Sequence, residues 1–139
     1  MAEKYAETKL VFNKPLNDDL NMRFFEGICS GSALLTEELP YAGDIGLVNG
    51  VHYIGYTSKE DMVDKAKHYL YNEVEREKIA LTGMLEVQTK HTYLNRCKQI
   101  LEVINPGVQN HVEKTIKKII KENIDKDKNV LARLAEAGY

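Results

Sequence analysis

The chain has 139 residues, close to the commonest size of a single domain and enough to bury one core. Its 43% hydrophobic and 29% charged residues are the balance of a soluble globular protein, and no stretch approaches the roughly 18 consecutive apolar residues of a transmembrane helix. With 19 basic and 21 acidic residues, the net charge of −2 gives no reason to expect nucleic acid as a partner, because that usually requires a basic face.

Residues 1–9 are polar and charged, so they lack the apolar segment of a secretory signal. Cys29 and Cys97 lie far apart in the sequence, and neither they nor the four histidines have the spacing of metal ligands. A glycine-rich phosphate loop is also lacking. We therefore expect reduced thiols, a cytoplasmic location, no metal and no bound cofactor.

The first third of the chain predicts a strand, a helix and a second strand. Residues 9–13 are a short apolar run typical of a buried strand. We expect Asn17 or Asp18 to cap the helix and Gly31 to end it, and residues 33–36 to form the second strand. The apolar residues of this helix fall on one face: Leu20, Phe24, Phe25, Ile28 and Cys29. Such a unit builds parallel sheets.

The middle of the chain predicts a loop, a third strand and the start of a helical region. Residues 37–50 are rich in glycine and proline and indicate a loop with one short helical turn. Residues 51–56 are the third strand candidate. Ser58 and Asp61 resemble a capping box that opens a helix, and Asn72 is expected to end it.

Helices are predicted for the rest of the chain, first over 74–88 and then up to Pro106. An apolar stripe follows within 108–123, and a short helix closes the chain. Four lysines lie between the apolar residues of this stripe: Lys114, Lys117, Lys118 and Lys121. They form either the solvated side of an amphipathic helix or a surface that binds a membrane or a partner helix. Early strands and late helices indicate an α/β domain over 1–104 with a helical extension over 105–139. Three strands are few for a doubly wound sheet, so we expect either that this domain is a fragment or that its exposed sheet edge is covered by another copy or another chain.

Two neighbouring segments carry a family resemblance. LNMRFFEG (residues 20–27) and CSGSALLT (29–36) resemble the block N-x-R-x-F-E-x-x-x-x-G-x-x-L-L-T in the C-terminal domain of GT-B glycosyltransferases, close to those grouped with spore maturation proteins. The likeness continues through YTSKED (56–61) and ends at HTYxxR (91–96), so it covers about two-thirds of the chain. It implies a partial Rossmann-like, three-layer domain, the C-terminal half of a GT-B enzyme.

The resemblance also implies a donor site for a nucleotide diphosphate sugar. The glutamate that Glu26 matches typically binds the ribose hydroxyls, which suits a carboxylate because it accepts two hydroxyl donors at once; alternatively Glu26 is merely solvated or capping. Asp18 stands where many retaining members have a second glutamate, or it only caps the helix. Arg23 shares a helix face with Glu26 and either meets the diphosphate or pairs with Glu26.

Thr36 and Glu37 are weaker candidates for the donor site. They end the second strand, where open α/β sheets place ligand contacts. Packing of Thr36 and solvation of Glu37 explain these residues equally well.

A complete GT-B enzyme has a second domain that supplies the acceptor site, and this chain has no room for it. We therefore expect a nucleotide-sugar-binding portion that is inactive alone and works with a separate N-terminal domain or partner chain. The alternative is a non-catalytic α/β module for protein association that uses residues 108–123. A homo-oligomer is expected under both hypotheses.

Overall fold

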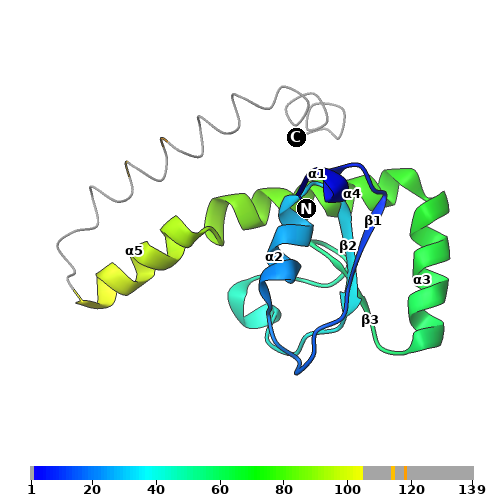
Figure 1. The fold of residues 1–139 in the computed structure, drawn as a ribbon, viewed down its shortest axis with the longest axis horizontal. Coiled ribbons are helices and arrows are strands. Elements are labelled where there is room, and N and C mark those ends of the chain that lie inside the picture. The colour runs from blue at the N-terminus through cyan, green and yellow to red at the C-terminus, as the bar shows by residue number, and fades with distance from the viewer. Residues whose placement is uncertain (1, 105–113, 115–117, 119–139) are drawn as a thin grey trace. The chain divides into compact units, whose positions relative to one another are not determined.

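The structure is a computed structural model, which describes residues 2–104, 114 and 118. Three strands, β1 (Leu10–Asn13), β2 (Ala33–Glu37) and β3 (Ile54–Tyr56), form one parallel sheet in the order β1-β2-β3 (Figure 1). Parallel pairing brings the carboxyl ends of all three strands to one edge of the sheet. The predicted α/β class and the partial Rossmann-like sheet are confirmed.

One face of the sheet is covered by helix α2 (Met22–Cys29), whose apolar side turns inward at Phe24 and Ile28. The Asn21 side chain caps this helix by accepting the amide hydrogen of Phe24 at 2.9 Å. After the helix the chain turns through Gly31 at φ +80°, a left-handed conformation that glycine adopts without strain, as predicted.

The predicted cap at Asn17 or Asp18 is wrong. Asp18 has φ +53°, so it turns the chain inside the loop between β1 and α2 instead of leading into a helix. Asp18 therefore lies in an exposed loop, and the helix does not begin until Met22.

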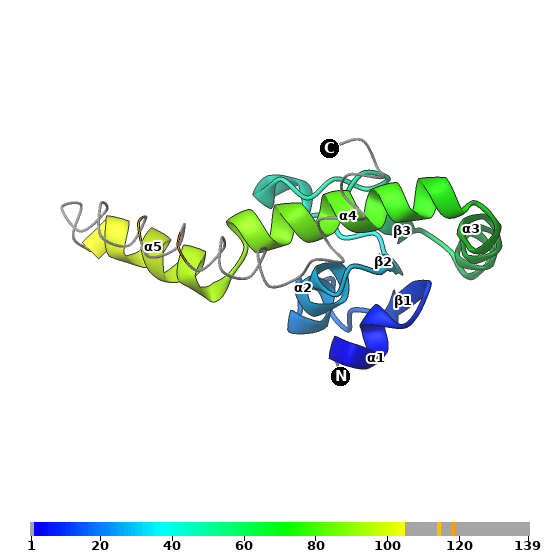
Figure 2. The same ribbon diagram turned by 90° about the horizontal axis from the view of Figure 1, so that it is seen from above.

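The opposite face is covered by α3 (Lys59–Tyr71), and in Figure 2 the strands lie between α2 and α3. Helix α4 (Glu73–Lys90) crosses from one side to the other, because its Ile79 and Ala80 pack on the α3 side and its Val87 packs with α2. Successive strand residues point to opposite faces, so Leu34 packs in a cluster with α2 and Leu35 in a second cluster with α3 and α4. The buried members of the first cluster are Val11, Phe24, Ile28, Leu34, Leu39, Ala42, Leu47, Tyr53 and Val87. The second consists of Ala33, Leu35, Ile54, Tyr56, Ile79 and Ala80, with Met62, Ala66 and Tyr69 partly buried beside it.

Between β2 and β3 the chain forms the predicted short turn, the 3-10 helix η1 (Gly43–Ile45). The third strand is shorter than predicted, because Val51 and His52 form a turn and pairing with β2 begins only at Ile54. A bridge from Asn49 to Tyr53 precedes it.

The capping prediction at α3 is confirmed in part. Ser58 Oγ accepts the amide hydrogen of Asp61 at 3.1 Å, as an N-cap does. The Asp61 carboxylate, however, accepts the amide hydrogen of Thr57 at 2.9 Å, one residue before the cap. The helix ends at Asn72, as predicted.

One helix was not predicted, α1 (Ala2–Ala6) at the start of the chain. The Ser32 hydroxyl lies 2.6 Å from the carbonyl oxygen of Tyr5 and 2.7 Å from that of Thr8, which fastens this segment beside β2. Its five residues carry no helical periodicity, so tertiary contacts decide its structure.

The chain divides into two compact units, residues 1–87 and 88–139. In the second unit, α5 (Tyr93–Ile104) follows a short link that contains His91. The Arg96 guanidinium lies 2.9 Å from His91 Nδ1.

The extension predicted for 105–139 lies outside the described residues, apart from exposed Lys114 and Lys118. The association surface predicted for 108–123 therefore stays a prediction. Within the described part of the chain, none of the helices is long and apolar enough to cross a membrane.

Candidate functional site

The strands end in a set of side chains that tie their carboxyl ends together. Asn13 Nδ2 donates to Thr36 Oγ1 at 3.1 Å, and both residues are wholly buried. The Tyr56 hydroxyl lies 3.5 Å from the Asn13 carbonyl oxygen and reaches from β3 across β2 to β1. Asn13 Oδ1 is buried without a hydrogen-bond partner. These contacts fix the backbone from which the loops at this edge begin.

Directly beyond these buried residues lies an ion pair between the ends of β1 and β2. Lys14 Nζ is 3.3 Å from Glu37 Oε2, and the side chains are 64% and 35% exposed. Burial raises the pKa of Tyr56, Glu37 raises it further, and Lys14 lowers it. Both charges therefore lie close to the Tyr56 phenol.

The outer face of α2 presents two charges. Arg23 and Glu26 are exposed, because Phe24, Gly27 and Ile28 occupy the inward side of the helix. Within the described part of the chain, neither Arg23 nor Glu26 has a hydrogen bond or ion pair through its side chain. The alternative of an Arg23–Glu26 ion pair is therefore not found, and both side chains stay available to a ligand.

The remaining predicted residues are divided between surface and core. Asp18 is exposed in the loop between β1 and α2, on the same edge as the ion pair. Glu37 is partly exposed, whereas Thr36 is wholly buried and contacts Asn13 instead of solvent. The structure brings Asp18, Glu37 and Arg23 to elements that begin or end at the carboxyl edge.

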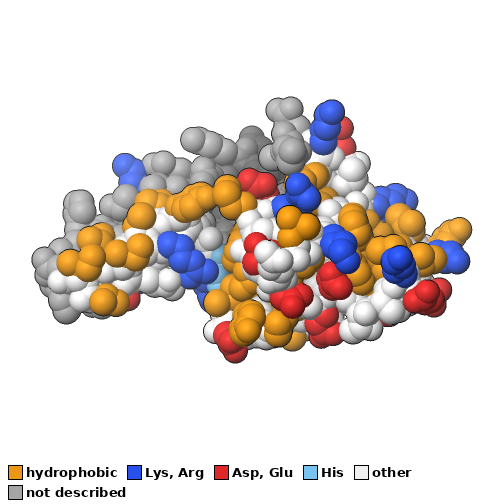
Figure 3. All heavy atoms as spheres, turned by 60° about the horizontal axis from the view of Figure 1, so that its bottom comes forward, with side chains coloured by type: hydrophobic (Ala, Val, Ile, Leu, Met, Phe, Trp, Pro, Cys, Tyr) orange, Lys and Arg blue, Asp and Glu red, His pale blue; other side chains and the backbone are white. Residues whose placement is uncertain are grey.

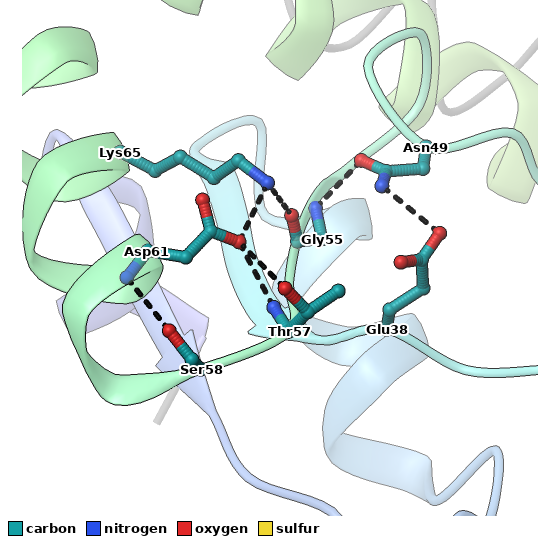
Figure 4. A network of polar contacts seen from close by, with 7 residues as sticks. All are labelled: Glu38, Asn49, Gly55, Thr57, Ser58, Asp61 and Lys65. Carbon is teal, nitrogen blue, oxygen red and sulfur yellow. Dashed lines mark hydrogen bonds and ion pairs between the residues drawn. The ribbon is translucent and has the colours of Figure 1, made fainter.

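Side chains not recognised from the sequence close the outer edge of β3 (Figure 4). The Tyr56 carbonyl oxygen accepts the amide hydrogen of Glu38 on the β2 side of the strand. The amide and carbonyl of the preceding residue, Gly55, therefore point to the other side, away from the sheet. Asn49 Oδ1 accepts the Gly55 amide hydrogen at 2.7 Å, and Lys65 Nζ donates to the Gly55 carbonyl at 2.6 Å. A further strand consequently finds both groups of Gly55 occupied.

The same network places acidic groups on the β3 side of the carboxyl edge. Asp61 Oδ2 lies 2.9 Å from Lys65 Nζ, and Glu38 Oε1 accepts from Asn49 Nδ2 at 3.3 Å (Figure 4). The Lys65 ammonium and the Thr57 amide hold the pKa of Asp61 below its usual value. Of this network, the sequence predicted only the capping box of Ser58 and Asp61, because Asn49 lies in a segment whose composition indicates a loop.

An open hollow of about 570 Å³ follows β2. Its lining consists of Glu38, Leu39, Pro40, Gly43, Leu47, Val48, Asn49 and Tyr53. Burial, and then the Glu38 charge, raise the pKa of Tyr53. The face of the molecule drawn in Figure 3 intermingles acidic, basic and hydrophobic side chains. Among the described residues, no three His, Cys, Asp or Glu side chains are grouped to hold a metal ion.

Comparison with known proteins decides the family. Residues 1–102, which contain the whole sheet and both of its helical layers, match the model of a family described as glycosyl transferase-like. The chain belongs to this family. No curated protein and no solved structure matches it significantly. The family supports a glycosyltransferase-related function for this domain and its charged carboxyl edge.

Proposed function

We propose that this chain is the nucleotide-sugar-binding portion of a two-domain GT-B glycosyltransferase of the type grouped with spore maturation proteins. It would hold a nucleotide diphosphate sugar from which the sugar is transferred to an acceptor. The observation that carries the proposal is the exposed Glu26 carboxylate on α2, which has no partner among the described residues. Helix α2 leaves the carboxyl edge of the sheet, where open α/β domains bind ligands.

Glu26 is proposed to accept hydrogen bonds from the ribose hydroxyls. A carboxylate only accepts hydrogen bonds, so its oxygens need donors from another group. A ribose diol offers two hydroxyl donors at adjacent positions. Arg23 lies one turn nearer the start of α2 and is proposed to face the diphosphate. Its planar guanidinium matches phosphate oxygens in pairs.

Asp18 and Glu37 are proposed to line the same edge. Thr36 cannot touch a donor with its buried side chain, so its proposed part is to hold Asn13 and the strand end in place. Catalysis requires reacting groups held within hydrogen-bond reach of one another. The second wall of the cleft is proposed to come from a separate domain or partner chain, so this chain alone should transfer no sugar.

An NMR titration of the isotope-labelled chain tests the proposal. UDP, GDP and their sugars should shift amides of residues 17–27 and 36–43 saturably, with one base preferred. Glu26→Ala should abolish these shifts, whereas Glu60→Ala, which removes another exposed helical carboxylate, should not. The proposal fails if no nucleotide moves α2 at millimolar concentration, or if Glu26→Ala binds as the wild type does.

A further inference from the structure

The carboxyl edge carries charges of both signs, and its cations differ in how they are held. On the side of β1 and α2 stand the cations of Lys14 and Arg23, both exposed. On the side of β3 the Lys65 ammonium is already engaged by the Asp61 carboxylate and the Gly55 carbonyl. A phosphate at this edge therefore finds its most accessible cations in Lys14 and Arg23.

Lys14 is the cation placed directly at the end of a strand. Its partner Glu37 is brought opposite by the sheet register, because the preceding residues, Asn13 and Thr36, pair across β1 and β2. At 3.3 Å, the Lys14–Glu37 contact is longer than a strong charge-assisted hydrogen bond, typically about 2.7–2.9 Å. Exposed pairs of this kind contribute little to stability, so the ammonium can change partners at small cost.

The backbone that leads into Lys14 is held by buried contacts, whereas the Lys14 side chain is exposed. Asn13, the preceding residue, is wholly buried and contacts Thr36 and Tyr56. The Lys14 side chain itself is 64% exposed. A flexible stem on a rigid strand end lets the ammonium swing from Glu37 to a ligand without moving the sheet.

We propose that Lys14 binds the diphosphate of the donor and that Glu37 holds Lys14 in place until the donor displaces it. This inference rests on the proposed function and names the group that receives the donor's charge. Two phosphate groups offer more negative charge and more acceptor oxygens than one carboxylate, so Lys14 exchanges a weak pair for a stronger one. The released Glu37 carboxylate is partly exposed and returns to water.

The experiment compares diphosphate with nucleoside affinity, measured by NMR titration of UDP against uridine and of GDP against guanosine. Lys14→Met should lower diphosphate affinity about tenfold and leave nucleoside affinity unchanged, since it removes one charged hydrogen bond. Glu37→Gln should raise diphosphate affinity severalfold, because Lys14 loses its competitor. Lys14→Arg should restore most of the loss. Lys67→Met, at an exposed lysine of α3, should change neither affinity.

Thermal unfolding of Lys14→Met should match that of the wild type, since the side chain is exposed. Two outcomes would overturn the role of Lys14 but leave the proposed function standing, provided that nucleosides still bind. One is an unchanged preference of Lys14→Met for the diphosphate over the nucleoside, and the other is weaker diphosphate binding by Glu37→Gln. Silence from every nucleoside and nucleotide in the wild type would overturn the proposed function, and this inference with it.

Discussion

The amide of Asn13 and the hydroxyl of Thr36 form a wholly buried hydrogen bond of 3.1 Å where β1 and β2 end. Asn13 Oδ1 is buried without a hydrogen-bond partner, so the bond from Nδ2 to Thr36 offsets part of the cost of burying this amide. The edge that carries Lys14 and Glu37 therefore depends on a buried polar pair.

Thr36→Val should lower the free energy of unfolding by about 1–3 kcal/mol, because it leaves Asn13 Nδ2 buried without an acceptor. Thr36→Ser keeps the hydroxyl and should lower it less. The double variant Asn13→Leu/Thr36→Val should be less destabilised than the sum of the two single variants. Urea unfolding of all four variants measures this, and strict additivity would contradict the buried bond.

Asn49→Ala should expose the outer edge of β3. The Gly55 amide loses its acceptor at 2.7 Å, and Glu38 loses the Asn49 donor. We expect faster hydrogen exchange at Gly55 and a loss of about 1–3 kcal/mol in the free energy of unfolding. Asn49→Asp keeps an acceptor for Gly55 and should protect that amide. Equal exchange in the Ala variant and the wild type would contradict the edge closure.

Gly83→Ala should destabilise the packing of α4 against the turn before β3. A methyl group at Gly83 would collide with the His52 carbonyl oxygen and would lie 2.9 Å from Ile28 Cγ2. Overpacking of this kind costs about 1–3 kcal/mol. Gly43→Ala is the matched control, since nothing lies within 4 Å of its added methyl group. Thermal unfolding should separate the two, and similar midpoints would count against this packing.

Asp61 should make stability depend on pH in the acidic range. The Lys65 hydrogen bond and the Thr57 amide hold its pKa below the ordinary value of 3.8. The folded state therefore binds its proton less readily than the unfolded state, so the stabilisation is present above pH 3.8 and is lost as the pH falls through the lower folded pKa.

Asp61→Asn tests this pH dependence. The variant should be less stable than the wild type at neutral pH, and the gap should close as the pH falls below 3.8. Denaturant unfolding at several pH values measures it. A gap that is constant or widens toward low pH would contradict the assigned interactions.

Local patterns predicted the elements whose boundaries are set by neighbouring residues. Ser58 capped its helix and Gly31 turned the chain as expected, because caps and left-handed glycines act within a few residues. The start of α2 was missed because Asn17, Asp18 and Asn21 are all good caps in isolation. Only the left-handed turn at Asp18 decides among them.

The candidate site was predictable where it depends on helix periodicity. Buried Phe24 and Ile28 fix the inward side of α2, which leaves Glu26 outside. The burial of Thr36 was not predictable, because its partner Asn13 is 23 residues away and meets it only through the sheet register.

The same limit applies to Arg76. Its guanidinium is almost wholly buried and donates to the Tyr69 carbonyl at 2.9 Å. From the sequence alone a charged residue is expected at the surface, and only the packed structure shows that this one is buried.

The proposed binding of the donor's ribose hydroxyls by Glu26 is tested by removing the hydroxyls and the carboxylate in turn. The affinities of the preferred nucleoside diphosphate and of its 2′,3′-dideoxy form are compared in the wild type, Glu26→Ala and Glu60→Ala. We predict that the wild type and Glu60→Ala prefer the diol about tenfold, as for loss of a charged hydrogen bond, and that Glu26→Ala shows no preference. If Glu26→Ala prefers the diol as strongly as the wild type does, Glu26 does not bind the ribose hydroxyls.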